Sequence, residues 1–337
     1  MSSKQLLSIL CLAVFLSGCQ SENSGLELAP NWQVSPLAEC ADDQPDMLAL
    51  SGNGQYLYQS CETSENLLSP SLARIDLASG KRDILLYGLE RADGLKLAPD
   101  GSLWLGEEAE DGLIWRIQNP DAMEPGQRVD RQRLVSSSDQ IKPLMTAGRF
   151  AHEGMAFSVD GRFAYLADEW EEGCVYRFIL ESQQLQVMHE TRGWLNIPLP
   201  SNARIEAEKL HGRFFSRIED MERHPDGRIL MAETDAGRIL VLDDRGTKPT
   251  ISTFLQHADL KQPDNLKWDA SRSWLWITDD DDPAKLWAWD GKTLQRIASH
   301  SSSEITGLET DPDGSIYINL QYRWFNPALT LRLYKGS

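Results

Sequence analysis

The chain has 337 residues, with 51 Asp and Glu against 33 Lys and Arg, so its formal net charge is −18 at pH 7. A strongly acidic protein repels nucleic acids and anionic lipid surfaces, so we expect neither as a partner of the folded part. The length allows one large domain or two smaller ones.

The N-terminus has the pattern of a bacterial lipoprotein signal. An apolar run over Leu6–Leu16 is too short to span a bilayer as a permanent helix, and Ser17-Gly18-Cys19 completes a lipobox. The pattern predicts a signal peptide over residues 1–18 and a lipidated N-terminus and tether over residues 19–30, with acylation at Cys19. Gln20 favours the outer membrane, facing the periplasm. An ordinary signal peptide with an incidental cysteine is the alternative.

A sequence repeat runs through the rest of the chain. Each copy has a polar or acidic opening residue, an apolar strand, a turn such as Asp-Gly, and a second strand rich in β-branched and aromatic residues. The openings lie 42 to 66 residues apart, and they are Asp46, Asp93, Glu153, Glu219, Asp264 and Thr306. Units of this length are typical of propeller blades.

The repeat predicts an all-β fold, a single six-bladed β-propeller domain over residues 31–337. Insertions at about 119–146 and 181–215 account for the two longest intervals, and we expect them to fold over one face. A β-sandwich with coincidental hairpins is the alternative, but six copies in one register argue against it.

Two sets of acidic residues recur at fixed places in this repeat. The openings form one set, and the exits of the following strands form the other, so both are expected near the axis. Carboxylates held together at low dielectric repel one another unless cations compensate them. Hard oxygen ligands of this kind suit Ca²⁺. The predicted metal ligands are Asp93, Glu107, Glu108, Glu153, Asp168, Glu169, Glu219, Asp220, Glu233, Asp264, Asn265 and Asp279. For any single residue, capping a blade turn is the alternative.

Four residues near this ring are candidates for a catalytic role: Arg149, His152, Glu153 and Arg217. His152 lies next to Glu153 and could bind a metal, contact an oxyanion or make only a structural hydrogen bond. Arg149 and Arg217 flank the ring in sequence and could bind phosphate oxygens. No Gly-x-Ser-x-Gly or His-Glu-x-x-His motif occurs, so metal ions would carry the chemistry of an enzyme.

The cysteines of the folded part suggest one disulfide. In an oxidising periplasm, Cys40 and Cys61 could be joined across the first blade. Cys174 is expected to be a buried thiol in a strand.

Several segments resemble the PhoX-type alkaline phosphatases. They include Gly148-Arg149-Phe150-Ala151-His152-Glu153, Trp104-Leu105-Gly106-Glu107-Glu108 and Phe215-Ser216-Arg217-Ile218-Glu219-Asp220, and the likeness extends over nearly the whole mature chain. The resemblance implies a six-bladed propeller with calcium and iron on the axis that hydrolyses phosphomonoesters. It places Glu107, Glu108, Glu153, Glu169, Glu219 and Asp264 on the acidic motifs around that family's metal centre.

The chain departs from this family at Gly106, which stands where the family has the cysteine that bridges its irons. We therefore expect Ca²⁺ in preference to Fe³⁺. The predicted function is metal-dependent hydrolysis of a small phosphate ester by a lipid-anchored monomer. Two alternatives stay open. One is a calcium-dependent lactonase or esterase resembling the gluconolactonase propellers, which Asp264-Asn265 would suit, and the other is a non-catalytic binding propeller.

Overall fold

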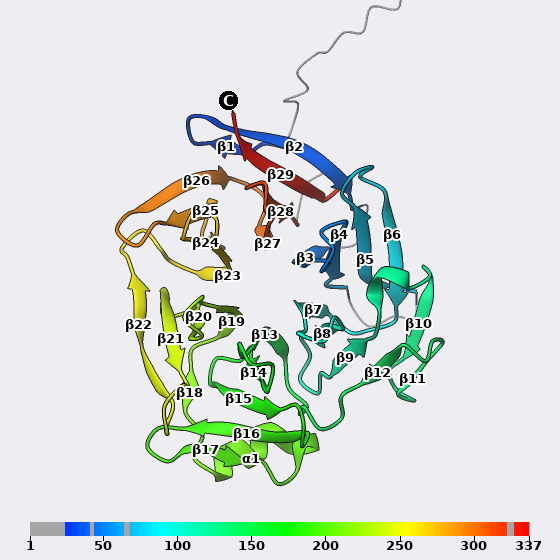
Figure 1. Cartoon of the computed structure of the whole chain (residues 1–337), viewed down its shortest axis with the longest axis vertical. Coiled ribbons are helices and arrows are strands. Elements are labelled where there is room, and N and C mark those ends of the chain that lie inside the picture. The colour runs from blue at the N-terminus through cyan, green and yellow to red at the C-terminus, as the bar shows by residue number, and fades with distance from the viewer. Residues whose placement is uncertain (1–23, 41–43, 64–67, 322–326, 337) are drawn as a thin grey trace, which may run out of the picture.

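The computed structural model describes residues 24–40, 44–63, 68–321 and 327–336. Six β-sheets are arranged around a central axis, and the innermost strand of each sheet faces that axis (Figure 1). The predicted all-β, six-bladed propeller is confirmed. The predicted signal peptide and Cys19 lie outside the described residues. Within the described ranges, no helix is long and apolar enough to cross a membrane.

Blades 1 to 3 follow one another along the chain, each starting with its innermost strand. Blade 1 contains β3 (Pro45–Leu50), β4 (Tyr56–Cys61), β5 (Pro70–Asp76), β6 (Arg82–Tyr87), β10 (Gln127–Asp130) and β11 (Val135–Ser136). Blade 2 contains β7 (Ala92–Leu97), β8 (Leu103–Glu107), β9 (Ile114–Ile117) and β12 (Ile141–Pro143). Blade 3 contains β13 (His152–Phe157), β14 (Phe163–Asp168), β15 (Gly173–Ile179), β16 (Gln184–His189), β17 (Gly193–Asn196) and β18 (Phe214–Phe215).

Blades 4 to 6 complete the disk, and strands from the N-terminal region close it. Blade 4 contains β19 (Ile218–Arg223), β20 (Ile229–Glu233), β21 (Arg238–Asp243) and β22 (Thr250–Gln256). Blade 5 contains β23 (Pro263–Asp269), β24 (Trp274–Asp279), β25 (Ala284–Trp289), β26 (Leu294–His300) and β1 (Glu27–Leu28). Blade 6 contains β27 (Ile305–Thr310), β28 (Ile316–Leu320), β29 (Leu329–Lys335) and β2 (Trp32–Glu39). Because β2 pairs with β29, backbone hydrogen bonds join a strand from the start of the described chain to its last strand. The tether predicted for residues 19–30 already enters the fold at β1.

The two insertions extend the outer edges of the blades. The segment 119–146 contains η1 (Pro120–Ala122) and supplies β10 and β11 to blade 1 and β12 to blade 2. The segment 181–215 supplies β16, β17 and β18 to blade 3, together with η2 (Pro200–Asn202) and α1 (Ala203–Lys209). Both lie at the rim of the disk in Figure 1. Much of their length is therefore regular blade structure.

The core consists of apolar clusters between neighbouring blades. The period of two in a strand sends alternate side chains to opposite faces of the sheet, so each blade contributes to two clusters. In β8, Trp104 packs against blade 3, while Leu103 and Leu105 pack against blade 1. The same division recurs around the disk, which explains why both faces of the blade strands are apolar.

The structure does not contain the predicted disulfide between Cys40 and Cys61. Cys40 follows β2 of blade 6, whereas Cys61 ends β4 of blade 1. Polar side chains contact both sulfurs: Cys40 Sγ is 3.5 Å from Gln59 Oε1, and Arg82 donates to both Gln59 Oε1 and Cys61 Sγ. The expected buried strand thiol is confirmed at Cys174 in β15.

Gly106 lies where β8 approaches the start of β13 very closely. A Cβ atom there would lie 2.3 Å from the His152 carbonyl oxygen and 2.8 Å from His152 Cβ. No side chain, cysteine included, fits at position 106 without a shift of the backbone of blade 3. The packing of blade 2 against blade 3 therefore excludes a cysteine side chain at this position.

We expect Gly106→Ala to lower the free energy of unfolding by about 1–3 kcal/mol, because overpacking forces neighbouring backbone to move. Thermal unfolding measures the effect. Gly52→Ala is the matched control, since a Cβ there would meet its nearest neighbour at 3.8 Å. Equal melting temperatures for the two variants would contradict the close approach.

Candidate metal centre on the propeller axis

The six innermost strands begin at the same end of the axis, and their second residues form the inner ring. Its members are Asp46, Asp93, Glu153, Glu219, Asp264 and Thr306. A shift in strand register occurs beside this residue in every blade. Such bulges redirect side chains locally, and here they recur at the position that carries the carboxylates.

An outer ring comes from the residues that directly follow the second strands. Its members are Glu62, Glu108, Glu169, Thr234, Asp280 and Gln321. In every blade the N–H of this residue donates to the carbonyl oxygen two positions before the inner-ring residue, with N···O distances of 2.8–3.1 Å. This repeated hydrogen bond fixes the two rings relative to each other.

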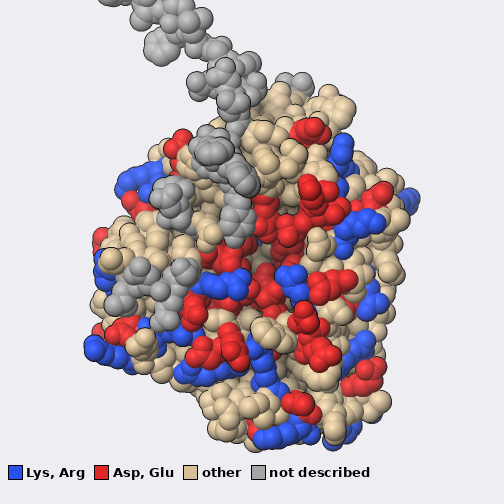
Figure 2. All heavy atoms as spheres, turned by 180° about the vertical axis from the view of Figure 1, so that it is seen from behind, with Lys and Arg blue, Asp and Glu red and all other residues tan. Residues whose placement is uncertain are grey.

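The two rings enclose a cavity of about 100 Å³ that is lined almost entirely by charged groups. Acidic side chains crowd the centre of this face of the disk, with basic side chains among them (Figure 2). Among the residues that the structure describes, the lining comprises ten carboxylates and two guanidinium groups: Asp46, Glu62, Asp93, Glu108, Glu153, Glu169, Glu219, Asp264, Asp280, Glu304, Arg91 and Arg217.

The two arginines occupy equivalent places, each two residues before an inner-ring carboxylate. Arg91 pairs with Glu62 at 2.8 Å and with Glu108 at 2.5 Å. Arg217 pairs with Glu169 at 2.8 Å and also with Glu219. Both have left-handed backbones, with φ of 43° and 55°, which is uncommon for a residue with a side chain. Two cations fall far short of neutralising ten carboxylates.

Burial and mutual repulsion make the ionised state of this cavity costly without further cations. Burial raises the pKa of Asp46, Asp93, Glu153 and Asp264 well above the ordinary value, and neighbouring carboxylates add to the effect. Burial, with Asp93 and Glu169 close by, also raises the pKa of Glu108 to about 11.

Two other cavity carboxyls have smaller shifts than Glu108. Burial raises the pKa of Glu219 to about 7. Arg217 and a hydrogen bond from Thr234 limit the increase. Burial and the nearby Asp280 raise the pKa of Glu304 to about 8.

One part of the cavity has the geometry of a cation site. Asp46, Glu62 and Asp93 each offer one oxygen, and these oxygens lie within 4.8 Å of one another. Asp93 Oδ1 is buried and has no hydrogen-bond partner among the described residues, and the same holds for Asn265 Oδ1 just below the inner ring. Unsatisfied buried oxygens are costly, and a hard cation would satisfy them. These residues fit Ca²⁺.

The structure brings many of the predicted site residues into this cavity. They are Asp93, Glu108, Glu153, Glu169, Glu219, Asp264 and Arg217. Sequence reasoning placed Asp46 on the inner ring and Asp280 at a strand exit but left both out of the ligand set, and it missed Glu62, Arg91 and Glu304 as site residues. Alignment of the blades contains the signal for three of them, because Glu62 and Asp280 align with Glu108, and Arg91 aligns with Arg217.

Four predicted ligands lie outside the cavity, at the last position of a second strand. Glu107, Asp168, Glu233 and Asp279 are all buried within the blades. Glu107 accepts hydrogen bonds from the backbone N–H groups of Glu90 and Leu113. Asp168 accepts a hydrogen bond from Arg204. Glu233 accepts from Ser216 N and Arg238, and Asp279 accepts from Gln262 N and Trp287 Nε1. These carboxylates hold the loops that precede the innermost strands.

Two more predicted ligands, Asp220 and Asn265, lie one residue below the inner ring. Asp220 accepts hydrogen bonds from Met221 N at 2.6 Å and Leu266 N at 2.9 Å, and it pairs with Lys96 at 3.4 Å. Asn265 Nδ2 donates to Asp264 Oδ1 at 2.6 Å, which supports the ring carboxylate. Asp220 is thus already satisfied by protein donors.

Arg149 and His152 are not in the cavity. Arg149 pairs with Asp111 at 3.5 Å at the surface. His152 is fully buried, its ring lies 3.8 Å from that of Phe150, and its Nε2 contacts Gly148 O. Burial lowers the pKa of His152 to about 3, so the imidazole is neutral. Strand alternation explains its place, because His152 precedes Glu153 and therefore points away from the axis.

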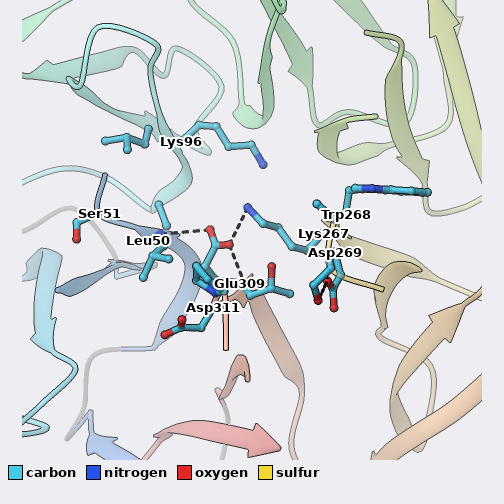
Figure 3. A pocket seen from close by; sticks show the side chains of 14 residues that line it. Leu50, Ser51, Lys96, Lys267, Trp268, Asp269, Glu309 and Asp311 are labelled. Carbon is cyan, nitrogen blue, oxygen red and sulfur yellow. Dashed lines mark hydrogen bonds and ion pairs between the residues drawn. The ribbon is translucent and has the colours of Figure 1, made fainter. Parts of the chain in front are cut away.

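The opposite end of the axis contains basic groups in a second, separate cavity of about 560 Å³. Lys96 and Lys267 point into it, and the Lys267 ammonium group pairs with Glu309 at 2.7 Å (Figure 3). Glu309 also accepts from Leu50 N at 3.2 Å. Every carboxylate and ammonium group named here has a protein partner, so this end carries its own charge compensation.

We expect metal-free protein to lose stability as the pH rises from 5 to 8. The cavity carboxyls have raised pKa values in the folded state, so folded protein binds more protons than unfolded protein over this range. The stability that the protonated carboxyls contribute is therefore lost as the pH rises through their folded-state pKa values. Melting temperatures measured against pH in EDTA test this. Saturating Ca²⁺ should flatten or reverse the slope, because it favours the ionised carboxylates. A metal-free melting temperature that rises over this range would contradict the expectation.

No protein-family model and no curated protein matches the chain. Similar solved structures include a structural-genomics protein assigned as a gluconolactonase, with a TM-score of 0.61 and 11% identity over 92% of this chain and 94% of that chain. A gluconolactonase from Xanthomonas campestris has a TM-score of 0.57 and 14% identity over 92% of this chain and 91% of that chain. The PQQ-bound aldose sugar dehydrogenase from Streptomyces coelicolor has a TM-score of 0.51 and 13% identity over 91% of this chain and all (100%) of that chain. At these identities the likeness shows the fold alone.

Proposed function

We propose that this propeller is a Ca²⁺-dependent hydrolase of carboxylic esters or lactones that acts in the acidic cavity. The observation that carries the proposal is the charge of the lining, ten carboxylates against two arginines that are both already paired. Such a cavity attracts a divalent cation and tolerates a neutral substrate. The similarity in fold to gluconolactonases supports the same choice.

The cavity charge weighs against the phosphatase function that the PhoX resemblance implies. A phosphate monoester is anionic and needs cationic donors. Arg149 lies outside the cavity, and Arg217 is paired with Glu169 and Glu219. A neutral ester avoids the repulsion that a phosphate group would meet.

Asp46, Glu62 and Asp93 would hold the cation at the side of blades 1 and 2. When bound there, Ca²⁺ would supply a positive charge that polarises the carbonyl oxygen of the substrate. Their outward neighbours support them: Arg91 holds Glu62, and Gln321 Nε2 donates to Asp46 Oδ2 at 2.9 Å and to Glu62 Oε2 at 3.1 Å.

Glu219 is the residue that we assign to proton transfer. It belongs to blade 4, which lies across the axis from blade 1 (Figure 1), and it lines the same cavity as the proposed cation ligands. Thr234 Oγ1 donates to Glu219 Oε2 at 2.6 Å, and Arg217 holds the other oxygen, so the carboxylate is fixed in orientation. Glu219 would take a proton from water as the water oxygen attacks the carbonyl carbon, and return it to the leaving alcohol oxygen when the ester bond breaks.

We expect turnover of p-nitrophenyl acetate or δ-gluconolactone to fall at least tenfold in EDTA and to recover with CaCl₂. Asp93→Asn should raise the Ca²⁺ concentration needed for half-maximal activity at least tenfold, since it removes a charged ligand. Asp259→Asn, at an exposed site, is the control. Calcium-dependent turnover of p-nitrophenyl phosphate, with esters and lactones left intact, would favour the phosphatase function instead. Iron in place of calcium should not restore activity.

Glu219→Gln should lower kcat at least a hundredfold, because the amide cannot accept the proton. The calcium requirement should change little, since the proposed ligands lie on other blades. Steady-state kinetics over a calcium titration separate the two effects. Unchanged kcat in Glu219→Gln would remove this residue from the reaction.

A further inference from the structure

Another pocket lies in blade 3, and it differs in character from both axial cavities. Its volume is about 410 Å³, and α1, β15 and β18 contribute to its walls. Three large apolar side chains in its lining are about half exposed: Trp170 at 54%, Ile205 at 53% and Phe214 at 51%. Single exposed apolar residues are common, but several that line one concavity indicate a binding site.

The Trp170 side chain is held in place. The Arg204 guanidinium lies 4.6 Å from the centre of the indole ring. Arg204 also donates to both carboxylate oxygens of Asp168, at 2.6 and 2.7 Å. The aromatic wall is therefore rigid before any ligand arrives, which lowers the entropy that binding must overcome.

The floor of this pocket contains an unused hydrogen-bonding group. Tyr176 is completely buried, and its ring stacks on Phe150 at 4.4 Å. Its hydroxyl has no hydrogen-bond partner among the residues that the structure describes. A buried hydroxyl without a partner is costly, and a polar atom of a ligand in the pocket would satisfy it.

The blade 3 pocket lies next to the acidic cavity, because consecutive residues of the chain line the two sites. Glu169 lines the acidic cavity, and the next residue, Trp170, lines the blade 3 pocket. The backbone N–H of Arg217, another cavity residue, donates to Trp170 O at 3.3 Å. One elongated molecule could thus occupy both sites.

We infer that the blade 3 pocket binds an uncharged, largely apolar acyl or aryl group of the substrate. One oxygen or nitrogen atom of that group would form a hydrogen bond with the Tyr176 hydroxyl. The inference rests on the proposed function, because it assigns the part of the ester or lactone that lies beyond the acidic cavity. The group is not anionic: Glu171, Glu172 and Glu208 line the pocket, and Arg204 is already neutralised by Asp168.

Binding of N-phenyl-1-naphthylamine to the full chain, followed by fluorescence, tests the pocket without catalysis. We expect Trp170→Ala and Phe214→Ala to weaken binding at least tenfold, and Tyr176→Phe about threefold or more. Val159→Ala, at another exposed apolar residue in a distant turn, should bind as the unaltered protein does. The anionic relative 8-anilinonaphthalene-1-sulfonate should bind at least tenfold more weakly. Affinity that is the same in Trp170→Ala, or tighter for the sulfonate, would overturn the inference.

Turnover of p-nitrophenyl esters separates this inference from the proposed function. With Ca²⁺ present, kcat/KM should be higher for the hexanoate than for the acetate, and Trp170→Ala should reduce that ratio at least fivefold. If no ester or lactone is hydrolysed but naphthylamine binding still depends on Trp170, the proposed function fails and the pocket stands. If esters are hydrolysed with a ratio that Trp170→Ala leaves unchanged, the pocket assignment fails alone.

Discussion

Repulsion among carboxylates at one end of the axis is the constraint on which the site depends. Ten of them surround about 100 Å³, and among the described residues that line this cavity only Arg91 and Arg217 oppose their charge. Rigid blades prevent the side chains from moving apart, because backbone hydrogen bonds and apolar packing between blades fix each inner strand. The protein must therefore bind protons or cations there, and this ties folding stability to ion binding.

The balance of acidic and basic side chains differs between the two ends of the axis. Below the rings, Asp220 accepts hydrogen bonds from neighbouring backbone donors and Asn265 donates one to Asp264, and at the opposite end Lys96 and Lys267 pair with carboxylates. Within the described parts of the chain, the carboxylates of the acidic end alone lack sufficient cationic partners. This asymmetry supports the placement of a cation, and of the proposed ester or lactone hydrolysis, at that end.

Blade 3 combines two roles that the other blades do not share within the described residues. It supplies Glu153 and Glu169 to the acidic cavity, and its extra elements, α1 and β18, form an apolar pocket beside it. The segment 181–215, predicted as an insertion over one face, thus extends the blade while adding Arg204, Ile205 and Phe214 to a surface next to the cavity. Loop variation on a rigid scaffold is the usual way that propellers and other folds vary specificity.

The sequence by itself determined the six blades and the inner ring, because turn residues and alternating apolar strands recur at regular spacing and equivalent positions must meet on the axis. Only the tertiary structure decided which of two adjacent acids faces the cavity. Glu108 does and Glu107 does not, since the strand ends between them and the backbone changes direction. Tertiary packing also placed Arg149 at the surface, put Cys40 and Cys61 at the ends of strands in different blades, and left no space for a side chain at Gly106. These outcomes depend on contacts between blades, which a repeat within one blade does not encode.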